Sequence, residues 1–331
     1  MAVQVRDNRP PVRISLACWD YDRTRGIADG RITPEGLIVD YIALPPEETF
    51  FRMARFREFD VAELSLSSYV VSRRSAEPTV VAVPVFPSRS FRHSGIYVRP
   101  EGSIARPEDL RGGRVGVAEY QLTANVWIRG ILDEHHGVPV RDVTYVTGGL
   151  EDPRRIEKLK LELPESIRVE PAPAGTTLSE LLARGELDAI YSPRAPSGAA
   201  RLFEDFPAVE RAYFEATRIF PIMHVLAIRS ELYERNRWVA RSLFKAFSAA
   251  RDEAIAALHE VAALKVSLPW TRAHAEEATR LMGDDYWSYG VDPNRHVLEK
   301  FLEYARDQGL ARDEQTVDSL FAPETLEEFA I

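Results

Sequence analysis

The sequence predicts a two-lobed α/β fold with a cleft between the lobes. A chain of 331 residues is longer than most single hydrophobic cores require. Short apolar strands alternate with helices, and this alternation starts again after Arg99-Pro100. The last third is nearly all helical, so it must pack on a sheet formed earlier in the chain. We therefore expect a discontinuous first lobe (1–99 and 222–331), a second lobe (104–216) and two crossings near 99–104 and 216–224.

The strands of the first lobe are short apolar runs that end at proline, glycine or charged residues. The first strand follows Pro10-Pro11, and Pro45-Pro46 end the second. We expect strands at 14–18, 36–44, 60–64, 80–86 and 95–98, with helices at 22–28, 46–56 and 65–74 between them. This order favours a largely parallel sheet with helices on both faces.

The second lobe repeats this alternation, whereas the C-terminal region does not. We expect helices of the second lobe at 106–112, 123–136 and 178–184 and strands at 114–118, 143–146 and 187–191. The proline-rich stretch 162–177 is expected to be a linker. From Ile222 a strand leads into helices at 231–262, 272–282 and 294–331, which we expect to pack on the first lobe.

Composition and charge exclude several classes of protein. The formal net charge of -9 argues against a nucleic-acid-binding protein. No stretch approaches the roughly 20 apolar residues that a membrane helix needs, and the N-terminus lacks the apolar segment and cleavage site of a signal peptide. The single cysteine, Cys18, leaves no internal disulfide and suits a reducing compartment. We therefore expect a cytoplasmic protein that contacts neither membrane nor nucleic acid.

Polar and aromatic side chains follow the predicted strands, which is where ligands bind in α/β sheets. Hydroxyls, guanidinium groups and helix N-termini together are typical of a cleft that binds an anion. The candidates from the first lobe are Trp19, Asp20, Glu63, Ser67, Ser68, Arg89, Arg92 and His93, and those from the second are Glu119, Tyr120, Gln121, Thr123, Thr147 and Arg194.

Each candidate also has a structural alternative. The serines can cap the helix that they open, and Trp19 can belong to the core. A lone histidine is more often structural than catalytic, although two arginines beside His93 favour a function. His224 lies on the returning strand, where exposure to the cleft and burial in the core are equally supported.

Motifs for cofactors, metals and activated nucleophiles are missing. The chain has no GxGxxG after a strand, no GxxxxGK(S/T), no HExxH, no CxxC and no GxSxG. It also has no histidine, cysteine or carboxylate residues at the spacing of metal ligands. We therefore expect an activity without a cofactor, or a binding function without catalysis.

Several long segments of the chain have an unusual sequence. They include SLACWDYDRTR (15–25), PEETFFRMARFREFDVAELSLSSYV (46–70), PVFPSRSFRHSGIYV (84–98), VGVAEYQLTANVWIRGIL (115–132) and LMGDDYWSYGV (281–291). These segments resemble those of one enzyme family, the 4,5-dihydroxyphthalate decarboxylases. The resemblance implies a type II periplasmic-binding-protein-like fold used as an enzyme. It also implies the conversion of 4,5-dihydroxyphthalate to 3,4-dihydroxybenzoate and CO₂ in phthalate breakdown.

This reaction suggests roles for the basic candidates. CO₂ leaves most easily when the ring carbon that bears the carboxylate is protonated while the para hydroxyl donates electrons. Arg89 and Arg92 are expected to hold the two carboxylates, because a guanidinium can grip a carboxylate through two hydrogen bonds. His93 is expected to protonate the ring, with His224 as the second choice.

The same reaction suggests roles for acidic and aromatic candidates. Asp20 or Glu63 is expected to accept the phenol proton, and Glu119 is a further candidate. Trp19 and Tyr120 are expected to enclose the aromatic ring. The remaining candidates are expected to bind the substrate, and a divalent ion chelated by its hydroxyls stays open.

Other functions and an oligomer are compatible with the sequence. A non-catalytic binding protein for a small aromatic acid would share the fold, but it must be exported and so needs a signal peptide. A decarboxylase of a different hydroxylated aromatic acid also fits, whereas a ligand-sensing regulator is weaker because no DNA-binding segment is evident. A homo-oligomer is possible, since these apolar C-terminal residues fit an interface or the core: Phe301, Leu302, Tyr304, Leu320 and Phe321.

Overall fold

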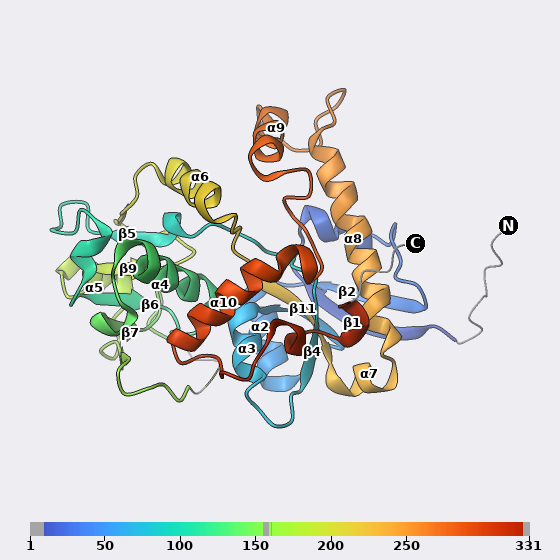
Figure 1. Cartoon of the computed structure of the whole chain (residues 1–331), viewed down its shortest axis with the longest axis horizontal. Helices are drawn as coiled ribbons and strands as arrows, with labels where there is room; N and C mark the ends of the chain where they lie inside the picture. Colours follow the sequence, from blue (N-terminus) through green and yellow to red (C-terminus); the bar gives the residue numbers. More distant parts are fainter. Residues whose placement is uncertain (1–9, 155–158, 160, 327–331) are drawn as a thin grey trace.

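Two β-sheets organise the structure, a computed structural model that describes residues 10–154, 159 and 161–326 (Figure 1). The first sheet contains, in spatial order, β2 (Leu37–Ala43), β1 (Val12–Cys18), β3 (Val61–Ser65), β11 (His224–Arg229) and β4 (Val80–Val83). The second contains β10 (Ala200–Arg201), β5 (Ile96–Val98), β9 (Ala189–Tyr191), β6 (Arg114–Val117), β7 (Thr144–Thr147) and β8 (Arg168–Pro171). Each sheet, with its helices, forms one lobe.

The first sheet brings the end of β3 and the start of β11 to one edge. β3 is buried along its whole length and pairs in parallel with β1. β11 runs antiparallel to β3, and His224 lies opposite Ser65 in the register. Because the two strands run in opposite directions, the first residue of β11 lies at the edge where β1 and β3 end. Ligands bind beyond this edge in open α/β sheets.

The structure differs from the predicted lobes in where the chain first crosses. β5 pairs with β9 and β10, so it belongs to the second sheet, whereas the sequence placed residues 1–99 in the first lobe. The chain therefore leaves the first sheet after β4 and crosses within residues 84–95, not near 99–104. The predicted linker 162–177 also contains a strand, β8, which pairs in parallel with β7.

Helices cover both sheets. Those around the first sheet are α1 (Arg25–Ala28), α2 (Pro46–Phe56), α3 (Leu66–Ser72), α7 (Ser230–Arg235) and α8 (Trp238–Leu258), and those around the second are α4 (Thr123–His136), α5 (Leu178–Arg184) and α6 (Phe206–Thr217). The predicted helix 231–262 is interrupted at Asn236, and the predicted helix 294–331 is interrupted at Gly309. In the part of the chain that the structure describes, no helix is long and apolar enough to cross a membrane.

The C-terminal region joins the two lobes, whereas the sequence predicted packing on the first lobe alone. Its helices are α9 (Thr271–Met282), α10 (Arg295–Asp307) and α11 (Val317–Leu320). α8 packs on β4, but α10 packs on α4 of the second lobe, and Figure 1 shows it running between the lobes. The apolar residues proposed for an interface are at most 4 % exposed and so belong to the core: Phe301, Leu302, Tyr304, Leu320 and Phe321.

A glycine allows α4 and α10 to approach closely. A Cβ atom at Gly130 would lie 2.1 Å from ring atom Cδ2 of Tyr304. A Gly130→Ala variant is expected to lower the free energy of unfolding by about 1 to 3 kcal/mol, the cost of overpacking a core, although alanine favours helix by roughly 1 kcal/mol. Urea denaturation measures the change.

The control for this prediction removes the ring. In a Tyr304→Ala background, the same Gly130→Ala change should be neutral or stabilising, since only the helix propensity remains. An equal loss of stability in both backgrounds would contradict the contact between Gly130 and Tyr304 as the cause.

Candidate active site

A buried carboxylate lies at the cleft edge of the first sheet. Glu63 of β3 is completely buried. Its Oε1 accepts hydrogen bonds from Tyr21 Oη at 2.8 Å and from His224 Nδ1 at 2.6 Å. Its Oε2 accepts from the backbone N of Trp19 at 3.2 Å and from Cys18 Sγ at 3.5 Å. Four donors from two segments of the chain, residues 18–21 and the start of β11, therefore surround this one negative charge.

The surroundings of Glu63 keep it ionised. Burial alone acts to raise the pKa of Glu63, but the positive charge of His224 and the hydrogen bonds from His224 and Tyr21 bring this pKa below its usual range. Burial and the adjacent Glu63 charge raise the pKa of the Cys18 thiol and of the Tyr21 hydroxyl. Both groups are therefore neutral donors to the carboxylate.

The imidazole of His224 is oriented by its neighbours. Glu63 binds Nδ1, and the ring of Phe50 meets the imidazole edge-on at 4.8 Å between centroids. The side chain of His224 is 18 % exposed, and Nε2 has no hydrogen-bond partner among the described residues. A carboxylate on one ring nitrogen fixes the orientation of the ring and leaves the other nitrogen able to exchange a proton with a ligand.

A polar junction beside this pair joins the lobes at the N-termini of two helices. Ser65, which precedes α3 and lies opposite His224, contacts Thr123 of α4 through their hydroxyl oxygens at 2.9 Å. The backbone N of Ser67 donates to Thr123 Oγ1 at 3.0 Å. The side-chain oxygens of Ser67 and Gln121 are buried without a partner among the described residues. Unpaired buried oxygens near two helix N-termini suit the binding of a polar ligand.

A cavity of about 400 Å³ opens between the lobes next to this junction. Its walls are Glu47 of α2 and the loops that follow β6, β7 and β9. Glu47 is one helical turn before Phe50, the residue in contact with His224, so the cavity borders the face of α2 that carries this contact. The volume lies within the range of about 300 to 1,000 Å³ that small-molecule sites occupy.

Arg194 reaches across this cavity from the second lobe. Its Nη1 lies 3.8 Å from Oε2 of Glu47, and both side chains are largely exposed. An exposed ion pair of this kind contributes little energy, so an anionic ligand can take the place of Glu47. Arg194, predicted as a substrate-binding residue, lines the cavity, whereas Arg89 and Arg92, the predicted carboxylate-binding arginines, do not.

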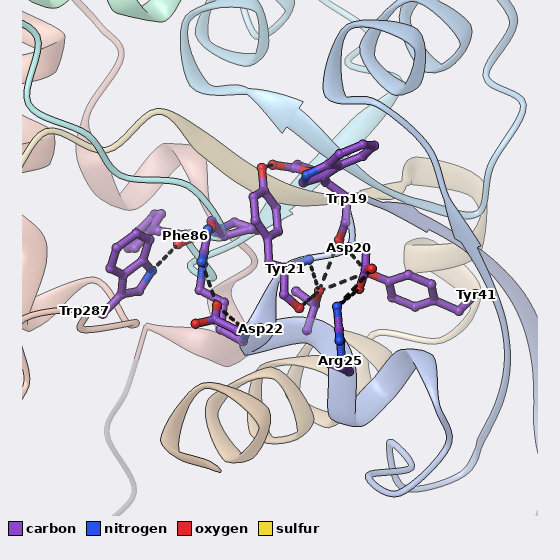
Figure 2. Close-up of polar contacts among 12 residues, drawn as sticks. Trp19, Asp20, Tyr21, Asp22, Arg25, Tyr41, Phe86 and Trp287 are labelled. Atoms are coloured by element: carbon purple, nitrogen blue, oxygen red, sulfur yellow. Dashed lines mark hydrogen bonds and ion pairs between the residues drawn. The ribbon is translucent and has the colours of Figure 1, made fainter. Parts of the chain in front are cut away.

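Trp19 and Asp20 lie side by side in the loop between β1 and α1, but their side chains have different surroundings (Figure 2). Trp19 is 39 % exposed and its backbone binds Glu63, so its ring is available to a ligand beside the pair. Asp20 turns away and pairs with Nη2 of Arg25 at 3.0 Å, as Figure 2 shows. This pairing does not support the predicted role of Asp20 as a base at the ring.

The arginines of the first crossing serve the structure instead of the cavity. Arg89 donates to the carbonyl oxygens of Phe220 at 3.0 Å and Ser288 at 2.7 Å, and it also contacts Asn294. Arg92 donates to Met223 Sδ at 3.0 Å. Burial lowers the pKa of both guanidinium groups. The predicted grip of these two arginines on a substrate is thus not supported, because neither lines the cavity between the lobes and both terminal nitrogens of Arg89 bind packed residues.

His93 is also placed away from the cavity. It is 2 % exposed and lies between the rings of Tyr213 at 5.1 Å and Phe203 at 5.6 Å. Burial, together with the charges of His135 and His136, lowers the pKa of His93 to about 4. A neutral histidine enclosed by aromatic rings is a poor acid at neutral pH, so this placement favours His224 for proton transfer.

The neutral state of His93 predicts acid sensitivity of the fold. Its folded pKa of about 4 lies below the ordinary value of 6.5, so the unfolded chain takes up a proton that the folded protein does not. The free energy of unfolding should therefore fall as the pH falls from 6.5 to about 4, by about 3 kcal/mol in total. Urea denaturation across this range measures the slope, and His93→Gln should flatten it. An unchanged slope in the variant would contradict this origin.

The other predicted residues of the second lobe are mostly buried. Tyr120 is 1 % exposed, stacks under Arg129 at 3.9 Å and donates to the carbonyl of Gln308 at 3.3 Å, so it belongs to the core and not to a substrate sandwich. Glu119 is equally buried and accepts from Gln121 Nε2 at 3.1 Å. Thr147 of the second lobe lines a separate cavity of about 270 Å³. The last candidate, Ser68, belongs to the first lobe, and its backbone N donates a hydrogen bond to the side chain of the cap residue Ser65.

Sequence reasoning missed Tyr21 and Phe50 as parts of the site. Tyr21 follows the first strand directly, so its position at a strand end was a usable signal. Phe50 was one of several apolar residues at helical spacing, and nothing local distinguished it.

In the described residues, no three His, Cys, Asp or Glu side chains gather closely enough to hold a metal ion.

Comparisons with known proteins point to one family. The chain is 44% identical over 327 residues to a 4,5-dihydroxyphthalate decarboxylase of Comamonas testosteroni, with 97% of this chain and 99% of that protein covered. It is 49% identical over 186 residues to a 4,5-dihydroxyphthalate decarboxylase of Pseudomonas putida, and this alignment covers 56% of this chain and 72% of that protein. No family model matches the sequence.

Solved structures identify the fold. A Candida albicans gene product described as having the generic periplasmic binding protein fold superposes with a TM-score of 0.50 at 13% identity, over 93% of each chain. At this identity the likeness concerns the fold alone. It confirms the predicted two-lobed periplasmic-binding-protein-like fold.

Proposed function

The chain belongs to the 4,5-dihydroxyphthalate decarboxylase family, and from this premise we propose that it converts 4,5-dihydroxyphthalate to 3,4-dihydroxybenzoate and CO₂ in the cavity between its lobes. The observation that carries the proposal is the pairing of His224 with the buried carboxylate of Glu63 at the cleft edge. An oriented imidazolium beside a cavity is what ring protonation needs.

In the proposed reaction, Nε2 of His224 donates its proton to the ring carbon that bears one carboxylate. The hydroxyl para to that carbon supplies electrons, and the ring becomes a cyclohexadienone. The carbon–carboxylate bond then breaks, its electron pair returns to the ring, and CO₂ leaves as aromaticity is restored. The base that accepted the proton of the para hydroxyl returns it to the oxygen as the aromatic ring re-forms. The substrate thus exchanges CO₂ for one proton, and His224 is reprotonated from solvent. Glu63 stabilises the imidazolium before the transfer.

Other residues near the cavity suit the charges of the substrate. The helix N-termini at Ser67 and Thr123 and the guanidinium of Arg194 offer favourable surroundings for carboxylates. Trp19 offers an exposed ring face. Glu119, a buried carboxylate of the second lobe, is the group that we propose as acceptor of the phenol proton.

The test is direct. The purified protein is mixed with 4,5-dihydroxyphthalate, with and without a chelator, and 3,4-dihydroxybenzoate and CO₂ are measured. We expect equal amounts of both products at a rate that the chelator does not change, since we propose a reaction without a metal or cofactor. Tight binding of the substrate without product would instead indicate a binding protein, and turnover of only another hydroxylated aromatic acid would reassign the substrate.

A further inference from the structure

One arginine near the Glu63–His224 pair is held rigidly, yet part of its hydrogen-bonding capacity is unused. The guanidinium of Arg23 lies between two rings, 4.1 Å from the centroid of Tyr21 and 4.3 Å from that of Trp287. Both of these aromatic residues are labelled in Figure 2. Its Nε donates to the carbonyl of Pro87 at 2.5 Å, and its Nη1 donates to Asp22 at 2.9 Å. The stacking and these two bonds fix the plane of the guanidinium.

The remaining terminal nitrogen of Arg23 is open. Nη2 has no hydrogen-bond partner among the described residues, and it is not one of the buried unpaired atoms. The side chain is 16 % exposed. A guanidinium with one accessible edge is arranged to receive an anion through charge-assisted hydrogen bonds.

Arg23 is linked to the proposed proton donor through Tyr21 and Glu63. The Tyr21 ring on which it stacks carries the hydroxyl that binds Glu63, so one phenol ring separates the guanidinium from the Glu63–His224 pair. The positive charge of Arg23 opposes the rise in the pKa of Tyr21 and Cys18, which indicates that its field reaches this network. A dicarboxylate with its two groups on adjacent ring carbons needs such a cation beside the carbon that is protonated.

We propose that Arg23 binds the carboxylate that the product keeps and so makes the site select 1,2-dicarboxylates over monocarboxylates. The inference rests on the proposed function, because it assumes that the neighbouring carbon faces His224. It also explains a chemical need. The carboxylate of 3,4-dihydroxybenzoate is itself para to a hydroxyl, so holding it on Arg23, away from His224, protects the product from losing a second CO₂.

The test compares binding of phthalate and benzoate by calorimetry. Neither compound has a para hydroxyl, so neither can react. In the Arg23→Gln variant, the preference for phthalate over benzoate is expected to fall by about 50-fold, the factor of one lost charge-assisted hydrogen-bonded pair. Arg25→Gln is the matched control, because Arg25 lies two residues further on and pairs with the exposed Asp20. This control should leave the preference unchanged.

Kinetics separate binding from a structural role. Arg23→Gln should raise KM for 4,5-dihydroxyphthalate by about 50-fold and change kcat by less than about threefold, since the lost contact is equal in ground and transition states. A fall in kcat with a shifted pH profile and an unchanged phthalate preference would overturn the proposal and assign Arg23 to support of Tyr21.

Two further measurements keep the outcome clear. Arg23→Lys retains the charge without the planar fork, so its phthalate preference should fall by only about fivefold. If Arg23→Gln does not fold, an unchanged preference in Arg23→Lys overturns the proposal. A wild-type protein that prefers phthalate but releases no CO₂ from 4,5-dihydroxyphthalate would disprove the proposed function, while the calorimetric comparison would still test Arg23.

Discussion

A His224→Gln variant is expected to lose roughly 100- to 10,000-fold of kcat on 4,5-dihydroxyphthalate, the usual contribution of a positioned general acid. Glutamine can keep a hydrogen bond to Glu63, but it cannot deliver a proton at neutral pH. The fold should persist, because His224 is the first residue of β11 and is partly exposed. Steady-state release of 3,4-dihydroxybenzoate measures the effect, and circular dichroism monitors the fold.

Two histidine variants serve as comparisons. His274→Gln changes an exposed residue of α9 and should leave kcat unchanged. His93→Gln tests the role that the sequence predicted for His93, and it should leave kcat per folded molecule within about threefold of the wild type, since no proton transfer is lost. If His93→Gln abolished turnover while His224→Gln did not, the assignment of His224 as the proton donor would be wrong.

A Glu63→Gln variant is expected to impair both turnover and stability. Without the carboxylate, the imidazolium of His224 loses the charge that stabilises it, and kcat should fall by about 100-fold or more. Removing one partner of a buried ion pair also costs about 3 kcal/mol of the free energy of unfolding. Turnover rates and urea denaturation measure the two effects separately.

Glu63 also predicts a pH dependence with a defined sign. Its folded pKa lies below the unfolded value, so its contribution to stability is present above the usual glutamate pKa and is lost as the pH falls through the folded value. The Glu63→Gln variant should lack this part of the fall in the free energy of unfolding at low pH. Glu234→Gln is the control, because Glu234 is exposed and makes no ion pair with the described residues.

A double variant tests whether Glu63 and His224 act as one unit. If they do, Glu63→Gln combined with His224→Gln should reduce kcat no further than His224→Gln alone, because the carboxylate acts through the imidazole. Multiplied losses in the double variant would mean that Glu63 acts on the substrate by another route, for example as the phenol base that the sequence suggested.

Much of the fold was predictable because its signals are local. The apolar runs of β1, β3 and β11 and the flanking prolines and charged residues appear in any short window of the sequence. The elements that were missed lack such signals. β8 reads Arg168–Pro171, a short, partly exposed edge strand with a proline, and its strand character depends on pairing with β7.

The site was predicted less well because it depends on contacts between distant residues. Glu63 and His224 are 161 positions apart, and only the antiparallel pairing of β3 and β11 brings them together. Arg89 has the composition of an anion-binding residue, but its partners Ser288 and Asn294 lie 199 and 205 positions away. A basic loop between lobes can face a ligand or a packed segment, and local sequence does not distinguish these outcomes.

By itself, the sequence determined the two-lobed α/β class and the family, because these follow from local apolar patterns and long shared segments. Only the tertiary structure decided that β5 belongs to the second sheet, that α10 packs on α4 of the second lobe, and which histidine pairs with a buried carboxylate. The physical reason is that burial and ionisation are set by what packs around a group. His93 and His224 have the same intrinsic chemistry, but one is enclosed by aromatic rings and the other is paired with a buried carboxylate.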